Sequence, residues 1–138
     1  MKNLKFVAAL GAAALMLGAC SGNDDSSDTS SGDATTAAEQ IDYTACLVSD
    51  AGGWDDKSFN QSAMEGLQQA VSELGVKEND AESTSSTDFE PNVQAMVDSN
   101  CNLIIGVGFN LADAIGAAAV ANSGVDFALV DSTFSDDY

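Results

Sequence analysis

The feature that most constrains the fold of this chain is a regular alternation of short apolar runs with amphipathic segments of helical period. Four segments are expected to be strands: 43–48, 76–84 (as a weak edge strand), 102–108 and 125–131. Three segments between them have the apolar spacing of helices: 59–74, a segment that opens at Glu90-Pro91-Asn92, and 111–122. This β-α-β-α-β-α-β order predicts an α/β fold, a parallel sheet with helices on both faces.

The loops that follow the strands are the expected binding edge of such a sheet. Right-handed crossovers place these loops along one edge, and small ligands bind there in open α/β sheets. Three loops qualify: 49–58, 106–110 and the segment after Val130. The first is the most informative, because it combines several carboxylates, a lysine and a tryptophan and leads directly into a helix.

Three side chains beside these loops suit a flat ligand. Phe59 either stacks on a planar ring such as a purine or is buried in the core. Asn60 has a donor and an acceptor that match the edge of a nucleobase, although it could also cap the helix or lie at the surface. Phe109 either lines the same pocket or closes the core.

Carboxylates end two of the expected strands. Asp50 and Asp131 are placed to accept hydrogen bonds from ligand hydroxyls, such as those of a ribose or another sugar. The alternative is loop capping, which is common for Asp in turns. Asp55, Asp56 and Lys57 either pair with one another or face water, and a calcium site built from the acids would lack the EF-hand spacing.

Local signals also set the limits of the first helix. Ser58 and Gln61 have the spacing of a capping box, in which each side chain would accept a hydrogen bond from a backbone amide at the helix start. Gly75 is expected to end the helix.

The N-terminus has the pattern of an export signal. A basic start and an apolar run, 6–17, precede Leu-Gly-Ala-Cys, which ends at Cys20. This ending resembles a bacterial lipobox and implies cleavage before Cys20 and lipid attachment to it; the alternative is an ordinary signal peptide with a chance cysteine. Small and acidic residues then form a flexible tether. We therefore expect a lipoprotein signal peptide at 1–19, the lipidated cysteine and tether at 20–41, and an α/β lobe at 42–138 on the extracytoplasmic face of the cell membrane.

Composition excludes several classes of function. The formal net charge is −18, from 22 acidic and 4 basic residues, so the basic footprint of a nucleic-acid-binding protein is absent. The chain has no histidine and no CxxC motif, so a zinc site or a histidine-based catalytic triad has nothing to build on. We also expect no cofactor. Cys46 and Cys101 either form a disulfide outside the cytoplasm or remain two small buried side chains.

Several of these features together resemble the basic membrane protein family. They are the lipobox, the acidic tether, Ser-Asp-Ala-Gly-Gly-Trp-Asp-Asp-Lys-Ser-Phe-Asn-Gln-Ser at 49–62 and Leu-Ile-Ile-Gly-Val-Gly-Phe at 103–109. The family comprises lipoproteins of the purine nucleoside receptor type that serve ABC importers. The resemblance covers most of residues 1–135 and implies a type I periplasmic-binding-protein fold, in which two α/β lobes close on a ligand.

The resemblance also implies roles for individual residues. Phe59 would stack on the base, Asn60 would bond to it, and Asp50 and Asp131 would lie at or near the nucleoside. Family members are considerably longer than this chain. We therefore expect an N-terminal fragment that supplies one lobe, without the second lobe and its stacking aromatic residue.

The expected function is that of an ABC importer's solute-binding lipoprotein, which captures purine nucleosides and delivers them to a membrane permease without chemical change. One alternative is the same scaffold binding a sugar or another small polar ligand. A second is an enzyme of the flavodoxin-like or hydrolase type, for which the chain offers no convincing pair of nucleophile and base. A third is a sensory or adhesive surface lipoprotein with no role in transport.

Overall fold

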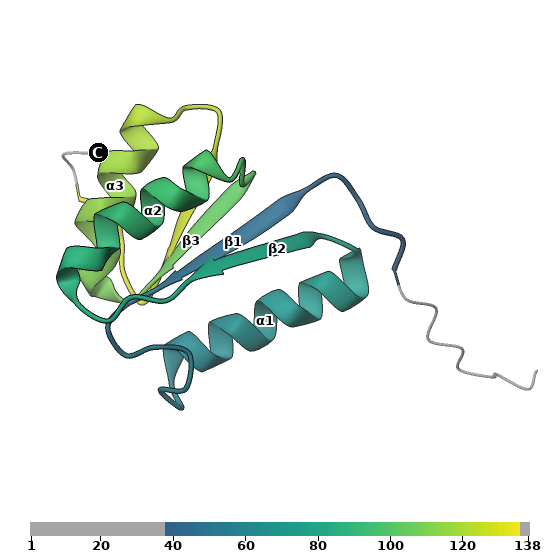
Figure 1. The fold of residues 1–138 in the computed structure, drawn as a ribbon, viewed down its shortest axis with the longest axis horizontal. Coiled ribbons are helices and arrows are strands. Elements are labelled where there is room, and N and C mark those ends of the chain that lie inside the picture. Colours follow the sequence, from purple (N-terminus) through teal and green to yellow (C-terminus); the bar gives the residue numbers. More distant parts are fainter. Residues whose placement is uncertain (1–37, 136–138) are drawn as a thin grey trace, which may run out of the picture. The chain divides into compact units, whose positions relative to one another are not determined.

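A four-stranded parallel sheet organises residues 38–135, the part of the chain that this computed structural model describes (Figure 1). The strands are β1 (Thr44–Ser49), β2 (Lys77–Ala81), β3 (Leu103–Val107) and β4 (Asp126–Val130). Their order across the sheet is β2-β1-β3-β4, and every pairing is parallel. The predicted edge position of the weak strand is confirmed, because β2 lies at one edge of the sheet. The expected signal peptide, Cys20 and most of the tether lie outside the described residues.

Helices cover both faces of the sheet, as the sequence predicts. They are α1 (Phe59–Leu74), α2 (Phe89–Asp98) and α3 (Ala112–Ala121), and short 3₁₀ turns, η1 (Ser86–Asp88) and η2 (Phe109–Leu111), lead into the last two. Helix α1 lies on one face, and α2 and α3 lie side by side on the other (Figure 1). The predicted α/β class, a parallel sheet with helices on both faces, is confirmed.

Strand β1 is the centre of the core because both of its faces are covered. Leu47 points into the cluster that packs on α1, whereas Cys46 and Val48 belong to the cluster under α2 and α3. Alternation along a strand sends successive side chains to opposite faces. This double burial explains the continuous apolar run of β1 and the absence of charge in it.

The limits of α1 match the sequence prediction, but its N-terminal cap does not. Gly75 ends the helix in a left-handed conformation, with φ of 70°. The predicted capping box at Ser58 is wrong, because the Ser58 side chain makes no capping hydrogen bond. The Gln61 side chain instead donates to Oε1 of Glu65 at 2.8 Å, an i,i+4 pair along the helix surface.

A disulfide ties the central strand to the turn between α2 and β3. It joins Cys46 and Cys101, whose Cα atoms are 6.1 Å apart, and both residues are buried. Of the two alternatives that the sequence leaves open for these cysteines, the structure has the bridge. The link holds α2 and β1 together across 55 residues of sequence.

Helix α1 covers only part of its face of the sheet. Beside it lies an apolar groove of about 280 Å³, lined by Ala45, Leu47, Ala63, Gly66, Leu67, Ala70, Leu103, Ile105 and Val130. The β3–β4 half of this face is therefore less deeply buried than the half under α1. Among residues 38–135, no helix is both long enough and apolar enough to cross a membrane.

Candidate functional site

The carboxyl ends of β1, β3 and β4 meet at one edge of the sheet. Ser49 is paired with Val107, which is paired with Val130. The residues that follow are Asp50, Gly108 and Asp131, so they leave the sheet side by side. The amide of Gly108 donates to the carbonyl of Val130 at 3.0 Å, which holds two of these exits together. The prediction that the three loops share one edge is confirmed.

Asp50 has one oxygen fixed by the protein and one oxygen open to the edge. Its Oδ1 accepts hydrogen bonds from the amide of Gly52 at 3.0 Å and from Nδ2 of Asn60 at 2.8 Å. Its Oδ2 has no donor among the residues that the structure describes. A Cβ atom on Gly108 would lie 2.7 Å from this Oδ2, so the lack of a side chain at position 108 makes room for the carboxylate.

The Asn60 side chain faces inward. It is 2% exposed, and its Nδ2 donates to Asp50 as described above. Its Oδ1 is buried and has no hydrogen-bond partner within the described part of the chain. Leaving a buried carbonyl unpaired costs about 1–3 kcal/mol. In this structure the amide nitrogen of Asn60 contacts Asp50.

Asp56 is the residue that caps α1, and sequence reasoning missed it. Its Oδ1 accepts from the amides of Ser58 at 2.8 Å and Gln61 at 3.1 Å, and its Oδ2 accepts from the amide of Asn60 at 3.2 Å. Burial raises the pKa of Asp56, but the backbone donors of Gln61, Ser58 and Asn60 outweigh it and leave the pKa below its ordinary value. An Asp two residues before a Ser at a helix start is a recognisable signal for such a turn.

Trp54 fastens the loop to the edge strand β2. Its Nε1 donates to Oδ2 of Asp80 at 3.0 Å, and its backbone amide donates to Oε1 of Glu82 at 3.3 Å. Its ring packs against the cluster under α1. The loop between β1 and α1 is therefore attached at both ends, by Trp54 to the sheet and by Asp56 to the helix.

A polar network of Ser49, Ser83 and Asn92 holds the backbone of Asp50. The hydroxyl of Ser49 donates to the carbonyl of Asp50 at 2.9 Å and accepts from the amide of Ser83 at 3.0 Å. Asn92 of α2 continues the chain by donating to the hydroxyl of Ser83 at 3.0 Å. Ser49 and Ser83 are buried. No periodicity or motif in the sequence indicates this network, which depends on how α2 packs.

Two phenylalanine rings stand exposed beside this edge. Phe59 at the start of α1 is 51% exposed, and Phe109 after β3 is 64% exposed. The alternative that these rings close the core is therefore wrong. Both rings are therefore accessible from solvent beside the edge.

Asp131 lies at the same edge but is held less tightly. Its backbone has φ of 62°, in the left-handed region that Asp tolerates better than most residues. The residue is exposed, and its carboxylate has no hydrogen-bond partner in residues 38–135. Of the five residues predicted for ligand binding, Phe59, Phe109 and Asp131 are exposed, Asp50 is half-buried, and Asn60 is buried with its amide hydrogen-bonded to Asp50.

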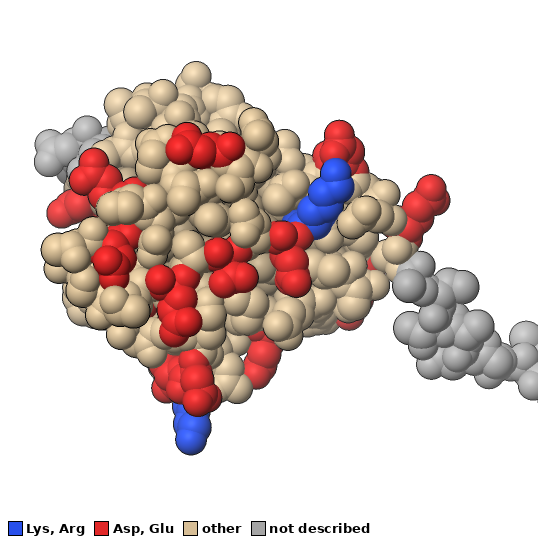
Figure 2. All heavy atoms as spheres, viewed as in Figure 1, with Lys and Arg blue, Asp and Glu red and all other residues tan. Residues whose placement is uncertain are grey.

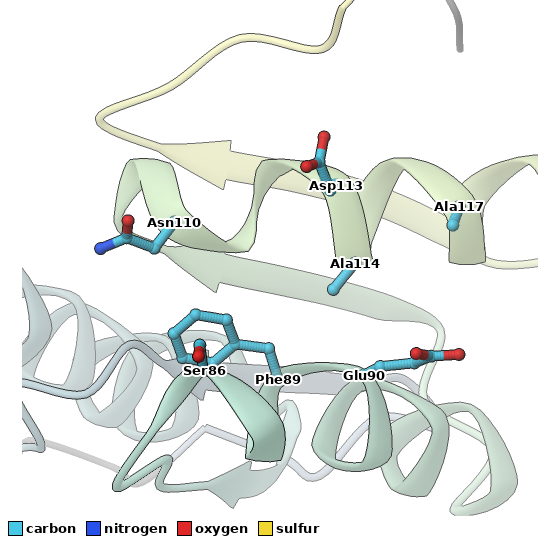
Figure 3. A pocket seen from close by; sticks show the side chains of 7 residues that line it. All are labelled: Ser86, Phe89, Glu90, Asn110, Asp113, Ala114 and Ala117. Carbon is cyan, nitrogen blue, oxygen red and sulfur yellow. The ribbon is translucent and has the colours of Figure 1, made fainter.

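A separate hollow of about 360 Å³ lies between α2 and α3 (Figure 3). Asn110, Asp113, Ala114 and Ala117 line it from the α3 side, and Ser86, Phe89 and Glu90 line it from the α2 side. The hollow includes none of the five predicted ligand-binding residues. Its polar lining residues are exposed. We therefore take the carboxyl edge, where the predicted ligand-binding residues lie, as the candidate site.

The described loops at this edge carry four aspartates, Asp50, Asp55, Asp56 and Asp131, and one lysine, Lys57. Acidic side chains are spread over the face shown in Figure 2, with few basic ones between them. Lys77, the first residue of β2, lies at the opposite end of the strands and is paired with Asp42, with its Nζ 2.7 Å from Oδ1. Within residues 38–135, no group of three or more His, Cys, Asp or Glu side chains lies close enough together to hold a metal ion.

Comparisons with known proteins agree with this architecture. Residues 44–137 match the model of a family described as Bmp, ABC transporter substrate-binding protein PnrA-like. The chain is 38% identical over 144 residues to a CD4+ T-cell-stimulating antigen of Listeria innocua serovar 6a, an alignment that covers 99% of this chain and 39% of that protein. It is also 38% identical over 106 residues to the ABC transporter nucleoside-binding protein BmpA of Lactococcus lactis subsp. cremoris, covering 74% of this chain and 30% of that protein.

A solved structure shares the fold. The ABC transporter system solute-binding protein of Aeropyrum pernix K1 superposes with a TM-score of 0.62 at 28% identity, over 68% of this chain and 26% of that one. The chain thus spans between 30% and 39% of the length of the two curated relatives above.

Proposed function

The chain belongs to the PnrA-like family of ABC transporter substrate-binding proteins, and from that membership we propose that it captures a purine nucleoside outside the cell membrane and delivers it to an ABC permease. A nucleoside has a flat base that can stack on an aromatic ring and ribose hydroxyl groups that can donate hydrogen bonds to carboxylates. The name of the Lactococcus relative, a nucleoside-binding protein, supports this choice of ligand.

One observation carries the proposal: two exposed phenylalanine rings lie at the same sheet edge as a carboxylate with an uncommitted oxygen. We assign stacking on the base to Phe59 and a second wall of the site to Phe109. Asp50 and Asp131 accept hydrogen bonds from ribose hydroxyls or base N–H groups, since bonds to a charged acceptor are the stronger kind.

We propose the following organisation for the chain. Residues 1–19 are a lipoprotein signal peptide, residues 20–41 are the lipidated Cys20 and its tether, and residues 42–138 form the ligand-binding lobe. This arrangement holds the lobe on the extracytoplasmic face of the membrane, within reach of a permease. Labelling of producing cells with palmitate should mark the wild-type protein and leave the Cys20→Ala variant unmarked; equal labelling of both would contradict the anchor.

Titration with inosine, guanosine, ribose and galactose tests the choice of ligand. Trp54 lies in the loop at the site, so its fluorescence should change on binding. We expect saturable changes with the two nucleosides and none with the two sugars. Sugar binding without nucleoside binding would favour the same scaffold as a sugar receptor, for which Asp50 and Asp131 would be equally suitable acceptors.

The proposed role involves no chemistry on the ligand. Inosine incubated with the protein should be recovered unchanged, as judged by chromatography. Release of free hypoxanthine in proportion to protein concentration would instead indicate an enzyme.

A further inference from the structure

We propose that Glu82 and Ser83, the two residues that follow β2, brace the loop between β1 and α1 and so hold it in the conformation that receives the ligand. Glu82 and Ser49 are the positioning residues of this brace. The inference rests on the proposed function, because that function assigns the ligand to groups that this loop carries or leads into.

The brace begins where the backbone pairing of β1 and β2 ends. The last paired residues of the two strands are Val48 and Ala81. Beyond them, the Ser49 hydroxyl accepts a hydrogen bond from the amide of Ser83 at 3.0 Å. This side chain therefore extends the attachment between the two segments past the last backbone pair.

The brace holds the loop on both sides of its first turn. The amide of Gly53 donates to the carbonyl of Asp50 at 3.3 Å and closes this turn. On one side, the hydroxyl of Ser49 donates to the same carbonyl at 2.9 Å. On the other side, Oε1 of Glu82 accepts from the amide of Trp54 at 3.3 Å. The turn that carries the Asp50 carboxylate is therefore fixed at both of its ends.

Glycine at position 53 lets the Glu82 carboxylate approach the loop. The φ of Gly53 is 68°, in the left-handed region, and a Cβ atom there would overlap Oε1 of Glu82. The carboxylate thus occupies the space that a side chain at position 53 would take. The contact between Glu82 and the loop therefore depends on the absence of that side chain.

Helix α2 holds the brace in place. Nδ2 of Asn92 donates to the carbonyl of Glu82 at 3.2 Å and to Oγ of Ser83 at 3.0 Å. The helix is itself packed on the core through the buried side chains of Val93 and Met96. The support therefore runs from the core through α2 to the brace, and from the brace to the loop.

The burial of the two serines favours a role beyond packing. Ser49 and Ser83 are both buried, and a buried hydroxyl group costs free energy unless it is hydrogen-bonded. An apolar side chain of similar size would carry no such requirement. The Ser49 hydroxyl donates to one backbone group and accepts from another, so its hydrogen bonds are committed to the loop and the brace. Satisfied buried networks of this kind make the segments that they join more rigid.

A loop held in this way is ordered before the ligand arrives. Order that exists in the free protein does not have to be imposed during binding, which favours affinity. Loss of the brace should therefore weaken binding even though Asp50 and Phe59 are still present.

Variants of Glu82 in the full chain test the brace, with inosine as the probe. Glu82→Ala removes the acceptor of the Trp54 amide, whereas Glu82→Gln keeps a carbonyl oxygen there and removes only the charge. We expect Glu82→Ala to weaken inosine binding about fivefold and Glu82→Gln to stay within about twofold of the wild type. Glu78→Ala, at an exposed acid of β2, is the control and should leave the Kd unchanged. Equal losses in the two Glu82 variants, or no loss in Glu82→Ala, would overturn the inference.

Hydrogen exchange without ligand separates bracing from direct contact with the ligand. The amides of Gly52 and Gly53 both donate to Asp50, and none of these substitutions removes their acceptors. They should exchange at least about fivefold faster in Glu82→Ala and in Ser49→Ala than in the wild type or Glu82→Gln. Weakened inosine binding with unchanged exchange would mean that Glu82 acts on the ligand itself, and would also overturn the inference.

Asn92→Ala, which frees the brace from α2, replaces Ser49→Ala should that variant not fold, and the same faster exchange is expected. Failure of inosine to bind the wild type would count against the proposed function alone. The exchange rates would then decide whether Glu82 and Ser83 hold the loop.

Discussion

Asp56 is the single residue on which the local geometry of the site depends most. Its carboxylate accepts three backbone hydrogen bonds, from Ser58, Asn60 and Gln61. These bonds start α1 at a fixed angle and so place Phe59 and Asn60. Carboxylates near a helix N-terminus are also favoured by the helix dipole.

The lowered pKa of Asp56 predicts a specific pH dependence of stability. A carboxyl group whose pKa is depressed by folding stabilises the folded state above its ordinary pKa, and this contribution is lost as the pH falls through the folded value. We expect Asp56→Ala to be less stable than the wild type at about pH 6, with the difference shrinking below about pH 4. Urea unfolding at several pH values measures this.

Asp55→Ala is the matched control for that comparison, because Asp55 is the exposed neighbouring acid. The free energy of unfolding of Asp55→Ala should equal that of the wild type at every pH. Asp42 and Asp88 also have pKa values lowered by their hydrogen-bond partners, but they are present in all three proteins and cancel. A constant gap between the wild type and Asp56→Ala from pH 6 to pH 2 would contradict the capping role.

Replacing Gly108 by alanine should lower both the stability of the fold and the affinity for inosine. Its φ of 100° is rarely adopted by residues with side chains, and a Cβ there would lie 2.7 Å from Oδ2 of Asp50. Gly108→Ala should therefore destabilise the fold by about 1–3 kcal/mol and weaken inosine binding by displacing the carboxylate. Gly124→Ala, at a loop glycine with open space around it, should do neither. Normal inosine affinity in a folded Gly108→Ala protein would count against the placement of Asp50.

The sequence predicts which residues lie at the candidate edge better than it predicts how their side chains are oriented. Asp50 and Asp131 follow from the position of strand ends, and Phe59 from its place at a helix start beside them. The inward turn of Asn60 could not be predicted, because it depends on how the 50–58 loop folds back over α1. Asp56 differs from Asn60 in this respect, because its position two residues before Ser58 at a helix start is a spacing that could have indicated its capping role.

At the scale of elements, apolar periodicity predicts the order and most limits of the helices and strands. The limits of α1 follow from its apolar spacing and from Gly75. Strand β2 was the weakest prediction because Lys77–Ala81 carries mostly polar side chains; it is a strand because it pairs with β1 at the edge of the sheet, where tertiary context outweighs propensity. The 3₁₀ turns before α2 and α3, and the capping box of Ser85 and Asp88, had no predicted counterpart.

The disulfide gives the element-scale prediction. It closes a loop with a sequence separation of 55 residues, for which the loss of chain entropy in the unfolded state corresponds to about 4 kcal/mol. Replacing both Cys46 and Cys101 by alanine should reduce the free energy of unfolding by about that amount, measured with urea. A reducing agent should destabilise the wild type similarly and leave the double variant unchanged. Equal stability of the oxidised and reduced wild type would contradict a bridge that holds the fold.

At the scale of the whole molecule, one sheet edge collects the ends of three strands, two exposed rings and an excess of negative charge. This convergence follows from parallel strands joined by right-handed crossovers. The loops at this edge carry Asp50, Asp55, Asp56 and Asp131 against one lysine, Lys57, so the local potential is negative. A negatively charged ligand therefore approaches against repulsion.

That potential predicts discrimination between a nucleoside and its nucleotide. Inosine 5′-monophosphate should bind at least about tenfold more weakly than inosine at low salt, because its phosphate meets carboxylates at the edge. Added sodium chloride should narrow the difference by screening. Competition titrations at two salt concentrations measure both effects. Equal affinity for the two compounds would show that charge plays no part in selection.

Replacing Phe59 by alanine tests the central claim most directly, because the ring at the tip of α1 is the group assigned to the base. Loss of one base–aromatic stack should weaken inosine binding about 5- to 150-fold with little change in stability, since Phe59 is 51% exposed. Leu74→Ala, which removes the 61% exposed side chain at the other end of the same helix, should leave the Kd for inosine unchanged. An unaltered Kd in Phe59→Ala would contradict nucleoside capture at this edge.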